Sequence, residues 1–374
     1  MSFASVLAAS DLPGLRARLE RVRRGEVEAV LGRGAASFAD FLALLSPAAS
    51  PLLEEMARIA HRLTVQRFGR TILLYAPLYL SSHCINGCPY CGYGAGRIVP
   101  RARLSAEQLE AEAVHLRRLG LRHVLLVAGE APALLPFSAI EDAACRVARL
   151  FSAVAVEVAP QDVAGYARLA AAGVDGVTLY QESYLPDVYA AVHPTGPKRG
   201  FARRLEAIEL AGAAGMRRLT IGALLGLADL RSEAIALGLH AGYLMRRFWQ
   251  AQLLVSLPRL RHVPEGFTIP APVGDRDLVQ LLLALRIGFP DLGLVLSTRE
   301  PAALRDRLVP LGITQLSAGS RTSPGGYTAV AAAAEQFGTE DRRSPAEVAE
   351  AVRGLGYDAV WKDWDDGLRQ AGVR

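Results

Sequence analysis

The pattern of hydrophobic and polar positions changes its period near residue 70. Before that point, apolar residues recur every three or four positions over residues 12–19, 38–45 and 51–68, which predicts helices. After it, short apolar runs with strand character alternate with amphipathic stretches, which is typical of βα units and a parallel sheet. Strands are predicted at residues 72–80, 123–128, 154–158, 176–181, 219–224, 253–257, 292–297 and 314–318.

A glycine junction repeats where predicted helices give way to strands. Gly120, Gly173, Gly215 and Gly312 are each followed by an apolar residue, two variable residues and a second apolar residue. We expect each glycine to end its helix in the left-handed conformation, so that the following apolar residue tucks the entering strand under the helix. A capping box predicts that the helix after the cysteine-rich segment begins at Ser105.

Eight strands with intervening helices predict an α/β fold, a TIM-like (βα)8 barrel with an N-terminal helical extension. A six-strand partial barrel is the alternative. We expect the extension at residues 1–70, the barrel at residues 71–320, and a C-terminal segment packed on the barrel at residues 321–374. In either barrel, the reacting groups should lie at the carboxyl ends of the strands.

Composition narrows the classes of partner. The 374-residue chain is 51% hydrophobic with a formal charge of +5, but its arginines occur in scattered pairs, which suit solvated helix faces better than a nucleic-acid surface. No apolar run has membrane-spanning length, and the N-terminus lacks the positive start of a secretory signal. We expect a cytoplasmic protein with no nucleic-acid or membrane partner. Lysine occurs only at Lys198 and Lys362, which we attribute to codon bias.

Cys84, Cys88 and Cys91 fall within eight residues in the spacing CX3CX2C. Three such thiolates can hold three irons of a [4Fe-4S] cluster and leave the fourth iron open, where S-adenosylmethionine (SAM) could bind. A structural zinc site is the alternative, but it takes four ligands, and His83 next to Cys84 would strain a tetrahedral site. Cys145 lies in a stretch of helical periodicity and is expected to be an inert core thiol. A disulfide framework is not expected, because four cysteines are too few for a chain of this length.

The cysteine spacing, with an aromatic residue beside the last cysteine, resembles the signature of the radical SAM superfamily. Other segments resemble 2-iminoacetate synthase, the tyrosine lyase of anaerobic thiazole (thiamine) biosynthesis, and its close relatives. They are LYLSSHC (78–84), LLVAGE (125–130), EVAP (157–160), YQESY (180–184), IGALLGL (221–227), SLPRLR (256–261), STRE (297–300), SPGGY (323–327) and VWKDW (360–364). The resemblance covers about residues 70–366 in unbroken order.

This resemblance implies a radical SAM barrel that uses a [4Fe-4S] cluster and SAM and receives electrons from a donor of the flavodoxin or ferredoxin type. A 5′-deoxyadenosyl radical would remove hydrogen from the amino group of L-tyrosine, and cleavage of the Cα–Cβ bond would give 2-iminoacetate and p-cresol. The unstable imine would pass to a thiazole synthase partner. A related maturase carries a second cluster in a cysteine-rich C-terminal domain. No cysteine follows Cys145 here, so reactions that need a second cluster are not expected.

Roles for individual residues follow from the resemblance and from positions near strand ends. Cys84, Cys88 and Cys91 would ligate the cluster. The residues expected to contact SAM are Tyr90 and Tyr93 near the adenine, Gly129 and Glu130 at the methionine amino group, and Arg204 at the methionine carboxylate. Glu157, Gln181 and Glu182 would contact SAM hydroxyls or the substrate ammonium. Arg299 would bind the tyrosine carboxylate as a guanidinium fork, with Ser317 beside it and Tyr79 at the substrate amine. The alternatives are core packing for Tyr79, a surface position for Arg204, and a space-filling role for Tyr90 or Tyr93 in the glycine-rich loop.

Two other functions remain open at this stage. The first is a related radical SAM lyase that acts on L-tryptophan or another aromatic amino acid, which an indole-sized pocket would favour. The second is a metal-binding structural module without catalysis, which predicts zinc in place of iron and sulfide. That hypothesis leaves the Glu and Arg side chains at the strand ends unexplained.

Overall fold

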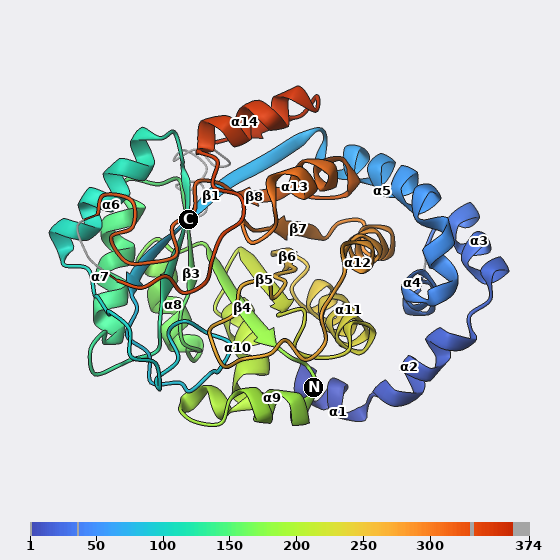
Figure 1. Ribbon diagram of the computed structural model, residues 1–374, viewed down its shortest axis with the longest axis horizontal. Helices are drawn as coiled ribbons and strands as arrows, with labels where there is room; N and C mark the ends of the chain where they lie inside the picture. The colour runs from blue at the N-terminus through green and yellow to red at the C-terminus, as the bar shows by residue number, and fades with distance from the viewer. Residues whose placement is uncertain (1, 36, 330–332, 362–374) are drawn as a thin grey trace.

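Eight parallel strands close into a barrel at the centre of the computed structural model, which describes residues 2–35, 37–329 and 333–361 (Figure 1). In this part of the chain the barrel strands follow one another in sequence order, and β2 pairs with β1 to close the ring. They are β1 Thr71–Ser81, β2 His123–Ala128, β3 Ala153–Glu157, β4 Gly176–Glu182, β5 Arg218–Ala223, β6 Gln252–Ser256, β7 Gly293–Leu296 and β8 Gln315–Ser317. The eight predicted strands are confirmed, and the six-strand alternative is wrong.

Side chains on β1 alternate between the barrel interior and the layer under the helices. Leu74, Ala76 and Leu78 are fully buried in the main hydrophobic core. Tyr75 and Tyr79, the residues between and after them, line a pocket inside the barrel. Because successive strand residues point to opposite faces, the outward set supplies packing and the inward set is available for chemistry.

Helices surround the barrel and connect its strands. They are α6 Ala106–Arg118, α7 Phe137–Ala148, α8 Val163–Ala171, α9 Pro186–Val192, η2 Pro197–Arg199, α10 Phe201–Ala213, α11 Leu230–Arg247, α12 Asp275–Gly288, α13 Ala302–Leu308 and η3 Val309–Leu311. The predicted capping box at Ser105 is present. The junction glycines have φ values of 95°, 94°, 83° and 142°, as expected where only glycine enters this region without strain. No helix in the described chain is long and apolar enough to cross a membrane.

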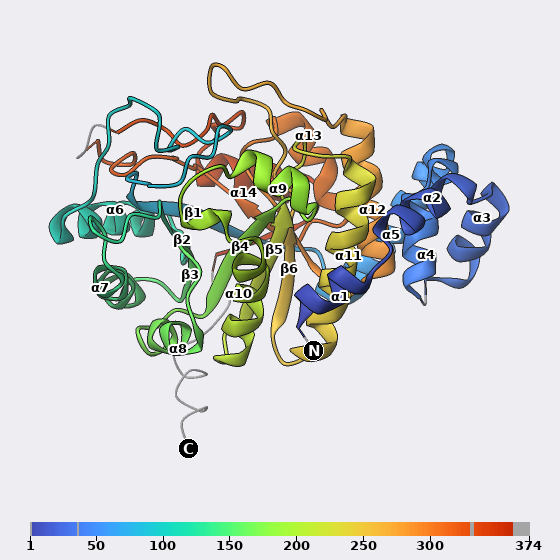
Figure 2. The same cartoon turned by 90° about the horizontal axis from the view of Figure 1, so that it is seen from below.

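A helical extension packs against one side of the barrel (Figures 1 and 2). Its elements are α1 Phe3–Ala9, α2 Leu12–Arg21, α3 Arg24–Arg33, α4 Phe38–Leu45, η1 Pro47–Leu52 and α5 Leu53–Phe68. The ring of Phe41 lies against Gly238 of α11 and Gly288 of α12, where a Cβ atom would come within 2.3 Å and 3.0 Å of the ring. Gln280 of α12 donates a buried hydrogen bond of 3.0 Å to the Leu44 carbonyl. Close packing and buried polar contacts therefore join the extension to the barrel.

The chain after β8 passes over the pocket before it forms α14 Pro345–Gly354 and β9 Asp358–Val360. Arg305 of α13 and Asp341 form a buried ion pair that holds this segment to the barrel. β9 pairs with the first residues of β1. The sequence did not predict β9, because three residues carry too little of a strand pattern. The WKDW motif lies partly outside the described residues, as does Lys362.

Candidate active site

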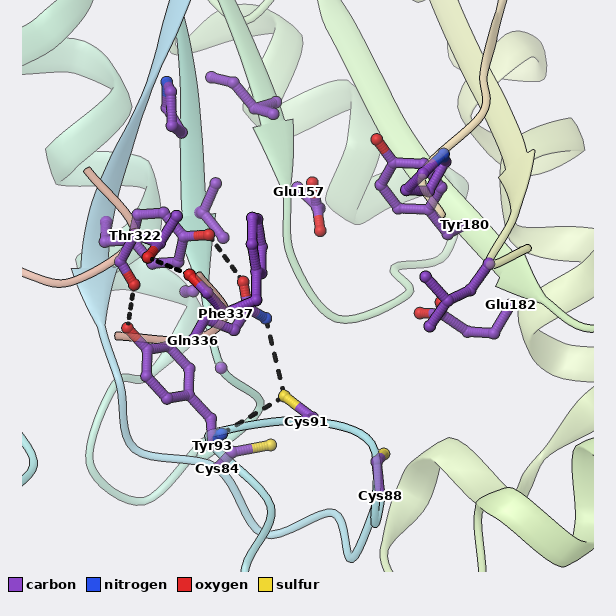
Figure 3. Close-up of a pocket in the computed structure, with 18 of the residues that line it drawn as sticks. Cys84, Cys88, Cys91, Tyr93, Glu157, Tyr180, Glu182, Thr322, Gln336 and Phe337 are labelled. Atoms are coloured by element: carbon purple, nitrogen blue, oxygen red, sulfur yellow. Dashed lines mark hydrogen bonds between the residues drawn. The ribbon is translucent and has the colours of Figure 1, made fainter. Parts of the chain in front are cut away.

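A pocket opens at the carboxyl ends of the barrel strands, and the cysteine loop after β1 forms one of its walls (Figure 3). The ends of β2, β3, β4, β7 and β8 supply further walls. The segment after β8 completes the lining with Thr322, Gln336 and Phe337. All the predicted site residues except Gln181 line this pocket. The fold therefore gathers residues that are far apart in the sequence.

The three cysteines face the pocket, and N–H groups are directed at two of their sulfur atoms. The backbone N–H of Tyr93 and the side-chain amide of Gln336 lie 3.4 Å and 3.8 Å from Cys91 Sγ. The Asn86 amide lies 3.7 Å from Cys84 Sγ. Such donors stabilise thiolates that ligate iron. Burial raises the pKa of Cys91 to about 11, and a bound metal centre would favour its thiolate form.

This donor set fits an iron–sulfur cluster better than a single zinc ion. Across the described ranges, no three histidine, cysteine or carboxylate side chains lie close enough to hold one metal ion. The three thiols instead lie along one wall of the pocket (Figure 3). A structural zinc ion needs four converging ligands, whereas a [4Fe-4S] cluster with one open iron takes three thiolates that are spaced apart.

Asn86 connects the cysteine loop to two other walls of the pocket. Its side-chain N–H donates to Glu130 Oε2 over 2.8 Å, and its side-chain carbonyl accepts from the Lys198 backbone N–H over 2.8 Å. The loop also packs directly on Gly129, where a Cβ atom would lie 2.3 Å from the His83 carbonyl oxygen. Only glycine fits there, so the Gly129–Glu130 element is held against the cysteines.

Glu182 has a left-handed backbone conformation and forms a close ion pair in the wall of the pocket. Its φ is 67°, a left-handed conformation that non-glycine residues rarely adopt outside strained sites. Lys198 Nζ lies 2.6 Å from its carboxylate and the Arg204 guanidinium lies 3.5 Å from it. Burial alone would raise the pKa of Glu182, but these two cations outweigh burial and hold the pKa below its ordinary value. Arg204 also donates to the Tyr180 carbonyl over 2.6 Å, so it is a pocket residue and not a surface residue.

Glu157 and Arg299 present opposite charges to the pocket interior. Burial, followed by the negative charge of Glu182, raises the pKa of Glu157 to about 7. Burial lowers the pKa of Arg299. The Arg299 guanidinium lies over the Phe337 ring, 3.4 Å from its centroid. Within the described residues, neither side chain makes a hydrogen bond or ion pair, so both can bind a ligand.

Hydroxyl groups in the lining are mostly engaged with the protein. Tyr79 donates to Gln336 Oε1 over 2.7 Å, and Ser317 Oγ accepts from the Thr298 backbone N–H over 3.0 Å. The Tyr93 hydroxyl donates to the Thr322 carbonyl over 2.7 Å. These contacts fix the rings and the serine in place, which suits positioning better than proton transfer.

Tyr90 forms a hydrogen bond with His193. Its hydroxyl lies 2.8 Å from His193 Nε2, while His193 Nδ1 lies 2.8 Å from the Tyr189 carbonyl. Burial, with added repulsion from Lys198, lowers the pKa of His193 to about 3, so the imidazole is neutral at physiological pH. A neutral ring with Nδ1–H donating to the carbonyl leaves Nε2 to accept from Tyr90.

Three expectations from the sequence need correction or qualification. Gln181 lies outside the pocket lining, because Tyr180 and Glu182 face inward and the residue between them on β4 faces the other way. Cys145 is exposed and is not a core thiol, because it lies off the face of α7 that carries the buried residues. Lys198 is not a product of codon bias alone, since it pairs with Glu182 in the pocket.

Several lining residues were missed in the sequence. Lys198 is one of two lysines in the chain, and this rarity was the available signal. Asn86 lies inside the cysteine motif and could have been selected for its position. Gln336 and Phe337 lie in a segment without a motif or periodicity, so no local signal could have found them.

Sequence comparisons match the chain to two family models and to curated relatives. The model of the radical SAM superfamily matches residues 78–235, and that of the Biotin and Thiamin Synthesis associated domain matches residues 256–358. The chain is 39% identical to the 2-iminoacetate synthase of Salmonella typhimurium over 96% of this chain and 95% of the relative. It is also 39% identical to the 2-iminoacetate synthase of Escherichia coli over 97% of each chain.

Solved structures share the architecture. HydG, a maturase of the [FeFe]-hydrogenase, superposes with a TM-score of 0.89 at 30% identity, over 97% of this chain and 83% of HydG. Methylornithine synthase (PylB) superposes with a TM-score of 0.72 at 19% identity, over 93% of this chain and 100% of PylB. At that identity, the second likeness concerns the fold alone.

Proposed function

The chain belongs to the 2-iminoacetate synthase family of radical SAM enzymes, and on that premise we propose that it cleaves the Cα–Cβ bond of L-tyrosine. The products would be 2-iminoacetate and p-cresol, with 5′-deoxyadenosine and methionine formed from SAM. The observation that carries the substrate assignment is the presence of Glu157 and Arg299 in one pocket, both without a polar partner among the described residues. An amino acid zwitterion has the complementary pair of charges.

The enzyme uses a [4Fe-4S] cluster and SAM, which together supply an electron and a 5′-deoxyadenosyl radical when they are bound. Cys84, Cys88 and Cys91 would hold the cluster. The protein's own contributions are the orientation of the substrate and the exclusion of water. Asn86 and Gln336 would support the cysteine loop, because their N–H groups are directed at cysteine sulfurs.

Arg299 is suited to the substrate carboxylate. Its guanidinium carbon lies over the Phe337 ring, and its N–H groups form a planar fork that can meet both carboxylate oxygens. Glu157 would then accept the substrate ammonium. Tyr79, fixed by Gln336, would pack beside the reacting amine, and Ser317 would border the carboxylate.

The wall built around Glu182 is suited to SAM. Lys198 and Arg204 supply two cations, and Glu182 neutralises part of their charge and orients them. We assign the SAM carboxylate to Arg204 and its amino group to Glu130 and the Gly129 backbone. Tyr90 and Tyr93 would border the adenine, with their hydroxyls held away by His193 and Thr322. This assignment gives Gln181 no contact with SAM or with the substrate, because Gln181 does not line the pocket.

The pathway, the protein partners and the compartment can be proposed from the chemistry of the reaction. The matched Biotin and Thiamin Synthesis associated domain supports a role in making the thiamine thiazole. The imine product hydrolyses in water, and direct delivery to a thiazole synthase partner would protect it from this loss. An external one-electron donor of the flavodoxin or ferredoxin type must supply the reducing equivalent. Free cluster thiols require a reducing compartment, which favours the cytoplasm.

An anaerobic assay of the reconstituted protein with SAM and a chemical reductant tests the proposal. L-tyrosine should give p-cresol, glyoxylate from the hydrolysed imine, and 5′-deoxyadenosine, whereas L-tryptophan should give none. Cys88→Ser should lose bound iron and activity. Cys145→Ser, at an exposed thiol away from the pocket, should keep both. Turnover of tryptophan alone would transfer the protein to another lyase group, and absence of 5′-deoxyadenosine with every substrate would overturn the proposal.

A further inference from the structure

Two cationic segments lie side by side around the cysteine loop. Residues 84–104 carry three arginines and no aspartate or glutamate, and residues 193–204 carry one lysine and three arginines, again without an acid. The segments contact each other directly. The Gly87 N–H donates to the Thr195 carbonyl over 3.2 Å, and the Lys198 N–H donates to Asn86 over 2.8 Å. These two adjoining segments therefore carry seven basic residues and no acidic residue.

Several of these side chains point to solvent. Arg103 and Arg199 are exposed, and Arg97 is half-buried. Within the described ranges Arg199 makes no ion pair, so its charge is uncompensated. Lys198 and Arg204 point the other way, into the pocket, where Glu182 neutralises part of their charge. Arg103 and Arg199 therefore face solvent, whereas Lys198 and Arg204 face the pocket.

Exposed apolar side chains occur in or beside the same segments as the arginines. Ile98 is fully exposed, at 104% of its reference area, and Ile85 is 47% exposed. Leu134, 51% exposed, lies beside them because Arg103 donates to its carbonyl and the Ile85 N–H donates to the Glu130 carbonyl over 2.9 Å. A small apolar centre with a charged rim is the composition of a transient protein interface. Nucleic acid would be met by cations and aromatic rings, not by isoleucines.

The same residues are connected to the cysteines by short paths. Ile85 directly follows Cys84 in the chain. Arg97 donates to the carbonyls of Cys91 and Pro89 over 3.0 Å and 2.6 Å. A molecule bound on this surface would therefore be separated from the cluster ligands by little more than the loop itself.

We propose that the surface defined by Ile85, Arg97, Ile98, Arg103 and Arg199, here called the cationic face, is the docking site of a small acidic one-electron carrier protein. This inference rests on the proposed function, which needs a reduced cluster. In the encounter, the carrier is oxidised by one electron and the cluster is reduced by one electron. No covalent bond forms or breaks and no proton moves. Opposite charges steer the carrier to the face, and the isoleucines exclude water at the contact.

The test compares two reductants of the reconstituted holoenzyme. The double variant Ile98→Asp, Arg199→Glu changes two exposed side chains whose loss should not affect folding. The matched control is Arg353→Glu, the same charge reversal at an exposed position on α14. Arg353 lies near the start of β1, whereas the cysteine loop follows its end. The rate of cluster reduction is followed by absorbance, first with reduced flavodoxin and then with reduced methyl viologen, both at low ionic strength.

We expect the double variant to be reduced by flavodoxin roughly tenfold more slowly than the native protein, with a difference that shrinks as salt is added. Methyl viologen should reduce both proteins at the same rate, and Arg353→Glu should match the native protein with either reductant. Equal flavodoxin rates for the double variant and the native protein, or equal slowing by the control, would overturn the docking site.

A second variant keeps the test decisive if the double variant binds less iron. Arg103 lies outside the cysteine motif, which ends at Cys91. Arg103→Glu should therefore slow cluster reduction by flavodoxin and leave reduction by methyl viologen unchanged. The proposed function is judged separately, because tyrosine cleavage with methyl viologen as the reductant does not depend on the cationic face. Failure of that cleavage in the native protein counts against the lyase assignment, whereas failure of the flavodoxin comparison counts against the docking site.

Discussion

The side-chain amide of Asn86 donates to Glu130 over 2.8 Å, which joins the cysteine loop to the end of β2. The same amide lies 3.7 Å from Cys84 Sγ. One side chain therefore sets the position of the Gly129–Glu130 element relative to a cluster ligand. If that element binds the amino group of SAM, Asn86 fixes the distance between the methionine end of SAM and the cluster.

Asn86→Asp should weaken SAM binding, and this loss should exceed any loss of bound iron. The new carboxylate faces Glu130, so repulsion would raise the pKa of one of the two acids and displace the other. We expect SAM affinity to fall about tenfold, which corresponds to about 1.4 kcal/mol. Equilibrium binding of SAM, with iron content as the control, measures the effect. Asn86→Ala, which removes the bond without adding charge, should have a smaller effect. An Asp variant with native SAM affinity would contradict the assignment.

Arg299→Lys should impair the use of tyrosine more than the use of SAM. Lysine keeps the charge but loses the planar fork and the face that lies over Phe337. Loss of about 2 kcal/mol of charge-assisted hydrogen bonding would raise the KM for tyrosine about 30-fold. Steady-state kinetics at saturating SAM measure the change. Arg307→Lys, at an exposed position on α13, is the control and should leave the KM for tyrosine unchanged. Equal effects of the two substitutions would refute the role of Arg299.

Binding of tyrosine should improve as the pH rises through about 7. The pKa of Glu157 is raised to about 7, so the carboxyl is mainly neutral below that pH and mainly ionised above it. Only the ionised form attracts the substrate ammonium, so the KM for tyrosine should fall as pH increases. Glu157→Gln should keep the high KM at every pH. Profiles of KM between about pH 6 and about pH 8.5 test this, and a Gln variant with the native profile would assign the titration to another group.

Asp341→Ala should destabilise the segment that covers the pocket. Asp341 and Arg305 are almost completely buried and paired, so removal of one partner leaves an uncompensated charge. We expect the free energy of unfolding to decrease by about 3 kcal/mol. Denaturant unfolding gives the value. The double substitution Arg305→Met, Asp341→Leu removes both charges and should cost less than the single one. If the double variant is the less stable, the explanation by an unpaired charge fails.

The cysteine motif shows how far local sequence can lead. Cys84, Cys88 and Cys91 lie on one loop, so their spacing alone restricted the ligand chemistry. Cys145 shows a signal that was overlooked. Its helix was evident, and Ile140, Ala144 and Val147 recur at the spacing of one apolar face, from which Cys145 is turned away.

The sequence by itself determined the barrel, because strand and helix periods, glycine junctions and the cysteine spacing are properties of neighbouring residues. Alternation along a strand is also a local rule, but the sequence prediction did not apply it at the end of β4, where Gln181 lies between the inward-facing Tyr180 and Glu182. The tertiary structure alone decided which distant side chains meet. Tyr79 and Gln336 are 257 positions apart and share a hydrogen bond, and Phe337 supports Arg299 from a segment without any pattern. Such contacts depend on how packed layers bring separate loops together over the strand ends, and no local periodicity records that arrangement.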